Sequence, residues 1–282
     1  MDLILRRNIY PVLLITALAA GLLCLFDYFA PLEPASVTAW AGITIGLVAA
    51  ASLIWPFRFL LIRSRKVAAL VLLSGAFITA TGLLWPARRV HTAQRSSRLD
   101  DFLPEYDFSE RHAVNVHATP EQTAAALRQV TFDDIKVFDA LMRIRAAAGG
   151  HFRTGPSPGQ RRVLDALSNP GSGFFPLHDD GREIVMCMAG RPWKSEPKPR
   201  MRAANDFAVF NAPGSVKIAF NLLVQEGDPG WSRVVTETRV RASDDAARSI
   251  MARYWRLICP GTGMIRRMWL NAMRDRAEQG TS

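Results

Sequence analysis

The chain has 282 residues, 49% hydrophobic and 21% charged, with 35 Lys and Arg against 25 Asp and Glu. Residues 1–96 carry a net charge of +6 and the remainder only +4, and no basic stripe with interleaved aromatic residues occurs in the remainder, so we expect no nucleic-acid partner. Three cysteines without CxxC or Cys/His spacing exclude a disulfide framework and a structural zinc site.

Three apolar segments occupy the first third of the chain, at about 9–29, 37–55 and 67–85. Each is long enough to cross a hydrocarbon layer of about 30 Å at 1.5 Å per residue. Buried core helices would need a soluble partner for every face, and a cleaved signal peptide explains only the first segment. We therefore predict a transmembrane region over residues 1–90, with the lipid bilayer as partner.

The basic residues around these segments bear on the orientation of the chain. Three spans place the two termini on opposite sides, with six Lys and Arg on the N-terminal side and four on the other. Counting positive charges favours a multi-pass protein whose soluble domain lies on the non-cytoplasmic side. If the first segment does not span, the domain is cytoplasmic.

A linker, residues 91–103, precedes a soluble domain over residues 104–282. Alternation predicts a strand over 110–118. Thr119 then begins a helix with the pattern of a capping box, and apolar spacing predicts a second helix over 132–144.

Strand-like periodicity dominates the second half of the domain. Residues 174–178 and 183–188 form a predicted hairpin. Strands over 206–211, 215–226 and 231–242 follow, as an antiparallel meander with one solvated face. Ser243 is the expected cap of a final helix, which Pro260 should kink or break before the helical pattern resumes.

This order of elements resembles the helix-grip superfamily known as SRPBCC (START-like, polyketide cyclase/dehydrase-like). The resemblance covers roughly residues 104–278, apart from an inserted Gly/Pro-rich stretch at 150–173. It is carried by Glu110-Arg111-His112, Thr119-Pro120-Glu121, the paired strands 215–226 and 231–242, and Tyr254-Trp255-Arg256-Leu257-Ile258. It implies an α+β fold in which a curved antiparallel sheet of six or seven strands wraps around a long C-terminal helix.

Few residues in the sequence are candidates for catalysis or metal binding. Turn formation explains His178-Asp179-Asp180, and Glu237, Arg239 and Arg241 have the alternation of surface pairs. His112 is a candidate general base without an assignable acid partner. The histidines show no metal-ligand spacing, so we expect no metal, no cofactor and no assignable catalytic residue.

Apolar stripes on the strands and the last helix are the strongest functional indication. Two interpretations of these stripes are open: they fill a solid core, or they line a cavity. The resemblance to the helix-grip superfamily implies a cavity for a hydrophobic ligand. The first hypothesis is a membrane-anchored module that binds or transfers a lipid or other apolar small molecule. The alternatives are a cyclase- or hydrolase-type enzyme with His112 as base, and a non-catalytic structural or sensor domain. The candidate pocket residues are Phe138, Val216, Ile218, Phe220, Leu222, Thr236, Thr238, Tyr254 and Trp255.

Overall fold

The computed structural model describes residues 33–54, 64–135, 160–194 and 196–280, with a few isolated positions (17, 21, 62, 138 and 140). The chain forms two compact units. The first comprises Met1–Pro86 with Ala252–Pro260, and the second comprises Ala87–Met251 with Gly261–Ser282. The last helix therefore contributes to both units.

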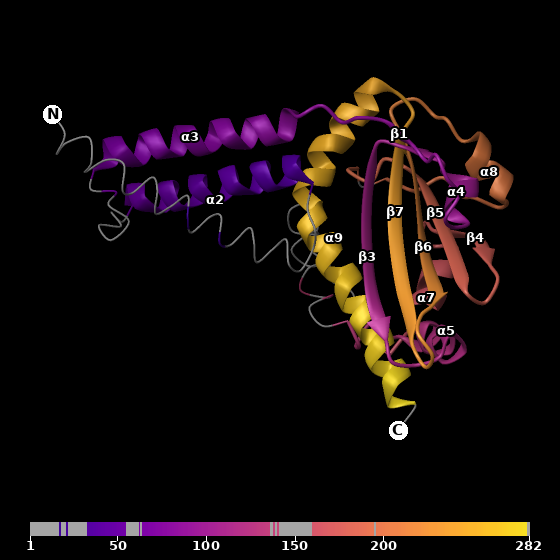
Figure 1. Cartoon of the computed structure of the whole chain (residues 1–282). Coiled ribbons are helices and arrows are strands. Elements are labelled where there is room, and N and C mark those ends of the chain that lie inside the picture. The colour runs from indigo at the N-terminus through magenta and orange to yellow at the C-terminus, as the bar shows by residue number, and fades with distance from the viewer. Residues whose placement is uncertain are drawn as a thin grey trace. The chain divides into compact units, whose positions relative to one another are not determined.

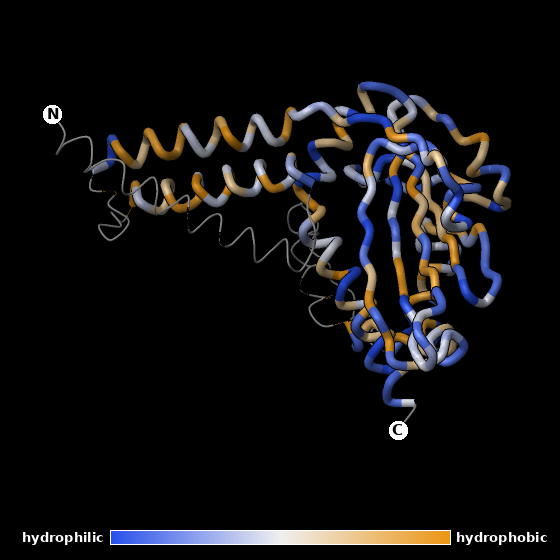
Figure 2. The backbone as a smooth tube through the Cα atoms, viewed as in Figure 1, coloured by the Kyte–Doolittle hydropathy of each residue, from blue (hydrophilic) through white to orange (hydrophobic). Residues whose placement is uncertain are grey.

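Two apolar helices account for most of the described residues of Met1–Pro86 (Figure 1). Helix α2 spans Pro34–Ile54 and helix α3 spans Arg65–Leu84, and each is long enough to cross a bilayer. Both are hydrophobic along most of their length (Figure 2). Large apolar side chains stay exposed on them, namely Leu47, Ile54, Leu70, Leu73, Phe77 and Leu84. The predicted segments 37–55 and 67–85 thus form helices, whereas the segment 9–29 lies outside the described residues.

Glycines bring α2 and α3 into close contact. A Cβ added at Gly42 would lie 2.3 Å from the backbone nitrogen of Thr79, and one at Gly82 would lie 2.4 Å from that of Ala39. Side chains larger than hydrogen cannot occupy these two positions without separating the helices. Such small-residue contacts are typical of helices that associate in lipid, where closely packed surfaces replace the hydrophobic effect.

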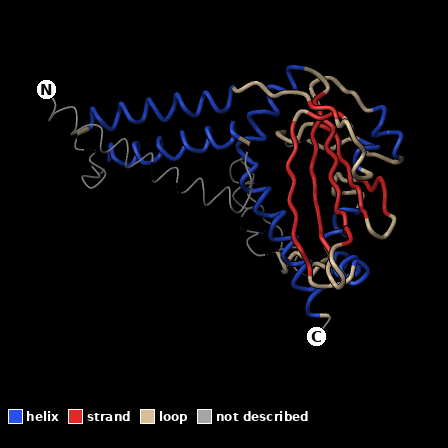
Figure 3. Tube along the Cα trace, in the orientation of Figure 1, coloured by secondary structure: helices blue, strands red, loops and turns tan. Residues whose placement is uncertain are grey.

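The second unit is built on a five-stranded antiparallel sheet (Figure 3). Its strand order is β3-β7-β6-β5-β4. The strands span Phe108–Val116 (β3), Phe175–Asp179 (β4), Glu183–Gly190 (β5), Val216–Glu226 (β6) and Ser232–Ala242 (β7). The prediction of six or seven strands is wrong for this sheet. The hairpin β4–β5 and the neighbouring pair β6–β7 are confirmed.

One predicted strand, residues 206–211, is instead the site of a short helix, α8 (Ala204–Val209). The Asp206 carboxylate accepts hydrogen bonds from the backbone N–H groups of Arg202 and Ala203. These bonds satisfy backbone donors at the start of the helix. The strand was predicted from the alternation of apolar and polar residues over six positions, a pattern that carries no information about capping.

The remaining elements are short. Helix α5 (Pro120–Gln129) begins with the predicted capping box between Thr119 and Gln122. A two-stranded sheet joins β1 (Val90–His91) to β2 (Glu105–Tyr106), and helix α7 spans Val163–Ser168. Most of the predicted helix 132–144 lies outside the described residues, and its first residues form a turn.

Helix α9, Asp245–Gln279, continues through Pro260, so the proline does not break it. Its N-cap is Asp244, whose carboxylate accepts from the Ala247 N–H, and not the predicted Ser243. From Gly261 onward the helix packs on what we call the inner face of the sheet. The main core lies there and includes Trp269, Leu270, Met273, Met186, Phe220 and Leu222. An antiparallel sheet packed on a long C-terminal helix is the arrangement expected of a helix-grip-like fold.

The outer face of the sheet is also covered, which corrects the prediction of a solvated face. Helix α4 (Leu99–Phe102) and α8 bring Leu99, Leu103 and Phe207 into a second core cluster with β5 and β6. Arg239 is only 3% exposed there, and donates to Asp100 at 2.7 Å and to Glu237 at 2.6 Å. The expected surface pair is therefore a buried network.

Candidate functional site

A buried acid–histidine pair lies on the inner face of β3. Strand alternation places Glu110 and His112 on the same side, and they are 7% and 6% exposed. His112 Nε2 lies 2.7 Å from Glu110 Oε1, a hydrogen-bonding distance. A partner acid for His112, which the sequence did not reveal, is thus two residues away on its own strand.

Helix α9 adds two polar groups, one turn apart, to this pair. The Thr262 hydroxyl donates to the second carboxylate oxygen of Glu110 at 3.2 Å. Arg266 is half-buried, with its guanidinium carbon 4.1 Å from the centre of the Phe220 ring. Its Nη1 donates to the Thr236 hydroxyl at 3.5 Å. Burial lowers the pKa of Arg266 to about 10, although the negative charge of Glu110 opposes this shift.

An unpartnered donor lies next to Arg266. The Trp269 side chain is almost fully buried against Phe220, with ring centres 6.4 Å apart, and its ring centre lies 5.6 Å from the Arg266 guanidinium. Its Nε1–H is buried and has no hydrogen-bond acceptor among the described residues. A buried donor left without a partner costs about 1–3 kcal/mol. We call Glu110, His112, Thr262, Arg266 and Trp269 the inner-face cluster.

The inner-face cluster can orient a polar group and exchange a proton. Glu110 can hold the His112 ring in one orientation, as an acid does for a general base. Among the described residues, no group of three His, Cys, Asp or Glu side chains is placed to hold a metal ion. Burial raises the pKa of the Cys187 thiol to about 12, so this cysteine is not a reactive nucleophile near neutral pH.

The predicted pocket residues separate into two groups. Phe220, Leu222 and the flanking Phe138 belong to the core between sheet and helix. Thr238 and Thr236 stand opposite Glu110 and His112 in the β3–β7 register. These positions surround the inner-face cluster.

The other predicted residues lie elsewhere. Val216 and Ile218 lie toward the start of β6, beyond Phe220. Tyr254 and Trp255 belong to the stretch Ala252–Pro260 of α9, which forms part of the unit with the apolar helices.

Sequence reasoning missed Glu110, Thr262, Arg266 and Trp269. For Glu110 a signal was present, because residues two apart on a strand share a face. The three α9 residues carried no such signal, since their partners lie between 30 and 152 positions away in the chain and only the packing of helix on sheet brings them together.

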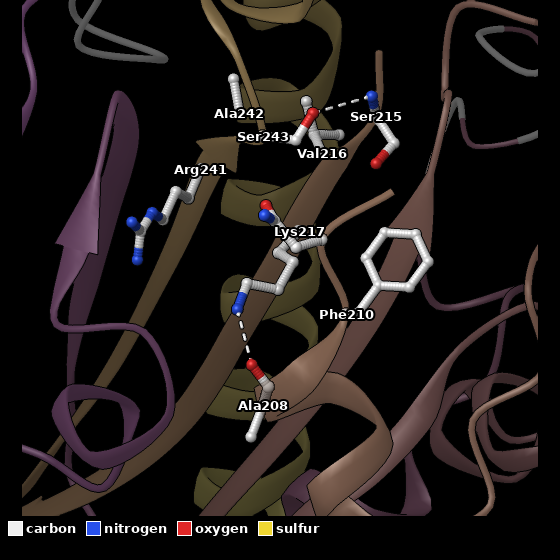
Figure 4. A pocket seen from close by; sticks show the side chains of 9 residues that line it. Ala208, Phe210, Ser215, Val216, Lys217, Arg241, Ala242 and Ser243 are labelled. Atoms are coloured by element: carbon white, nitrogen blue, oxygen red, sulfur yellow. Dashed lines mark hydrogen bonds between the residues drawn. The ribbon is translucent and has the colours of Figure 1, made fainter. Parts of the chain in front are cut away.

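A separate pocket of about 210 Å³ lies near the start of β6 (Figure 4). Its cations already have partners. Lys217 donates to the Ala208 carbonyl at 3.2 Å, and Arg241 pairs with Glu105 at 3.1 Å. Burial and the nearby Arg241 charge lower the pKa of Lys217. Apart from Val216, none of the predicted pocket residues lines this hollow, and we assign no function to it.

Another buried polar group lies within the unit of apolar helices. Arg256 is 1% exposed and donates to Glu33 at 3.2 Å and to the Leu83 carbonyl at 2.8 Å. The Trp40 indole N–H donates to the Arg256 carbonyl at 2.9 Å. Pro260 has no N–H to give this carbonyl its usual helical bond, so Trp40 supplies the missing donor.

A scan against protein-family models finds no match to this chain, and a comparison with curated proteins finds none either.

Proposed function

We propose that the protein is a membrane-anchored, helix-grip-like module of the SRPBCC type that binds a lipid or another apolar small molecule at the inner face of its sheet. The inner-face cluster is the observation that carries this proposal. Buried charged and polar groups are costly in an apolar layer, and the Trp269 N–H has no acceptor in the part of the chain that the structure describes. A ligand with an apolar body and a polar end would contact Phe220 and supply that acceptor.

A ligand that contacts Phe220 would have to displace side chains packed on it, because Phe220 is 2% exposed. Arg266 is half-buried, and so are Ile265 and Met268, which flank the core on the same helix. We infer that a ligand approaches the cluster along this partly exposed side of α9. Helices α2 and α3 support the membrane part of the proposal, since an anchored module would meet apolar ligands where they are most concentrated.

Native mass spectrometry of the full chain, released from detergent and followed by organic extraction, tests the proposal. We expect a co-purifying apolar mass in the wild type and its loss in Phe220→Leu. The matched control is Phe207→Leu, because Phe207 is an equally buried phenylalanine on the outer face. Loss in both variants, or a bare protein after incubation with a lipid extract, would contradict binding at the inner face.

A second candidate function, acid–base catalysis, is favoured by one specific observation. Glu110 and His112 lie 2.7 Å apart and are shielded from water, as in a base held by an acid. In this cyclase- or hydrolase-type alternative, His112 takes a proton from the bound molecule or from water.

The same extraction separates the two functions. If His112 is catalytic, His112→Gln retains the substrate, and its co-purifying mass differs from that of the wild type. If the domain only binds, both proteins carry the same mass. The control is His117→Gln, since His117 contacts Trp231 near the end of the sheet and is not part of the cluster.

A further inference from the structure

The charge balance of the inner-face cluster indicates which kind of polar end a ligand would carry. Both oxygens of Glu110 are occupied, one by His112 and the other by Thr262. Among the described residues, no carboxylate forms an ion pair with Arg266, whose contacts are the weak hydrogen bond to Thr236 and its packing on the Phe220 and Trp269 rings. The cluster thus has more donors than acceptors at its α9 side.

Two of these donors are close neighbours. Arg266 and Trp269 are three positions apart on α9, so both lie on the same face of the helix. Both also pack on the Phe220 ring. The Arg266 guanidinium lies over the Phe220 ring, and the Trp269 indole packs against the same ring in a T-shaped arrangement. Among the described residues, the Thr236 hydroxyl at 3.5 Å is the acceptor for Arg266, and the Trp269 N–H has none.

We propose that the ligand is an amphipathic acid, whose anionic oxygens accept hydrogen bonds from Arg266 and Trp269 while its apolar chain lies against Phe220. This inference rests on the proposed function and adds the class of ligand. An oxygen anion fits the donors because a guanidinium binds it through two N–H groups and the indole can supply a third. A neutral lipid, such as a sterol or a diacylglycerol, would offer the guanidinium no anionic oxygen to bind through two N–H groups.

Competition binding to the full chain in detergent tests the head group. The probes share an eighteen-carbon chain and differ only in the polar end: oleic acid, oleyl alcohol and oleoyl lysophosphatidic acid. Hydrogen bonds to charged groups are strong in a partly buried site, so we expect an acid to bind at least about tenfold more tightly than the alcohol. Preference for the carboxylate or for the phosphate then identifies which anion the site prefers.

Two variants assign the preference to the residues. Arg266→Met keeps a long side chain and should abolish the discrimination between acid and alcohol. Trp269→Phe keeps a ring and removes the N–H, and it should weaken acid binding several-fold more than alcohol binding. The controls are Arg253→Met, an exposed arginine on the same helix, and Trp231→Phe, a half-exposed tryptophan, which should preserve the wild-type ratio.

The outcomes separate this inference from the proposed function. Equal binding of acid and alcohol by the wild type would overturn the acidic head group and leave apolar binding intact. A drop in both affinities by the same factor in Arg266→Met would also overturn it, because the arginine would then act only through packing. Failure of every probe to bind would contradict the proposed function itself.

Discussion

At the scale of single residues, the domain uses buried and half-buried ions in two ways. Arg239 on the outer face is matched by Asp100 and Glu237, and the Asp100 pKa is lowered because hydrogen bonds from Ser96 and Arg239 outweigh the effect of burial. Arg266 on the inner face forms no ion pair with a carboxylate of the residues that the structure describes. A buried arginine that is paired with carboxylates stabilises the fold, whereas an arginine without such a pair is available to a ligand.

Asp180, in the β4–β5 turn, makes the acid stability of the domain testable. Hydrogen bonds from Glu183 N–H and from His178 lower its pKa from 3.8 to about 2. A lowered folded-state pKa gives a stabilising contribution that is present above about pH 4 and disappears as the pH falls through 2. The melting temperature of Asp180→Asn should therefore lie below that of the wild type at pH 6 and approach it at pH 2. A constant difference across this range would contradict the assignment.

At the scale of secondary-structure elements, the apolar helices are held together by backbone contact. Gly42 on α2 lies against Thr79, whereas Gly46, one turn later, has only a side-chain atom 3.9 Å from the position of an added Cβ. The two glycines therefore form a matched pair in which only the first is required by packing.

Gly42→Ala should destabilise the helix pair by more than about 1 kcal/mol, because the added methyl overlaps backbone atoms that cannot move independently. Gly46→Ala should be neutral or slightly stabilising, since alanine favours the helix. Thermal unfolding of both variants in the same detergent, followed by circular dichroism, measures the difference. Equal melting temperatures would show that the helices do not pack as described.

The hydrogen bond between Trp40 of α2 and the Arg256 carbonyl of α9 can also be tested by thermal unfolding of variants. Removing the donor in Trp40→Phe should cost about 1 kcal/mol, the value of one hydrogen bond, because the Arg256 carbonyl loses its donor. Pro260→Ala restores a helical N–H to that carbonyl. In the Pro260→Ala background, Trp40→Phe should therefore cost less. An unchanged cost in this double-mutant cycle would mean that Trp40 acts by packing alone.

At the scale of the whole molecule, membrane insertion is the property from which the proposed function starts. We expect the full chain to stay with the membrane fraction after alkaline carbonate extraction, because about 20 apolar residues in each of two helices would have to leave the bilayer together. Protease added to sealed cells should cleave the soluble domain if it lies on the non-cytoplasmic side, as the basic residues favour. Release by carbonate would contradict the anchor, and protection from protease would reverse the orientation.

Local patterns were sufficient to predict much of the fold. Uninterrupted apolar runs predicted α2 and α3, Thr119 and Gln122 predicted the start of α5, and alternation predicted the strands β6 and β7. In each case the signal lies within about 20 neighbouring residues, where helical or strand period and capping chemistry decide the conformation.

Only the tertiary structure decided the rest. Arg239 has the alternation of a surface residue, yet it is buried because α4, whose Asp100 lies 139 residues earlier in the chain, covers the outer face. Thr262 and Glu110 meet because α9 packs on β3, 152 positions away. The sequence by itself determined which segments are apolar, helical or extended, since those properties depend on near neighbours. It did not determine which charges are paired, because pairing depends on distant segments that share one desolvated layer.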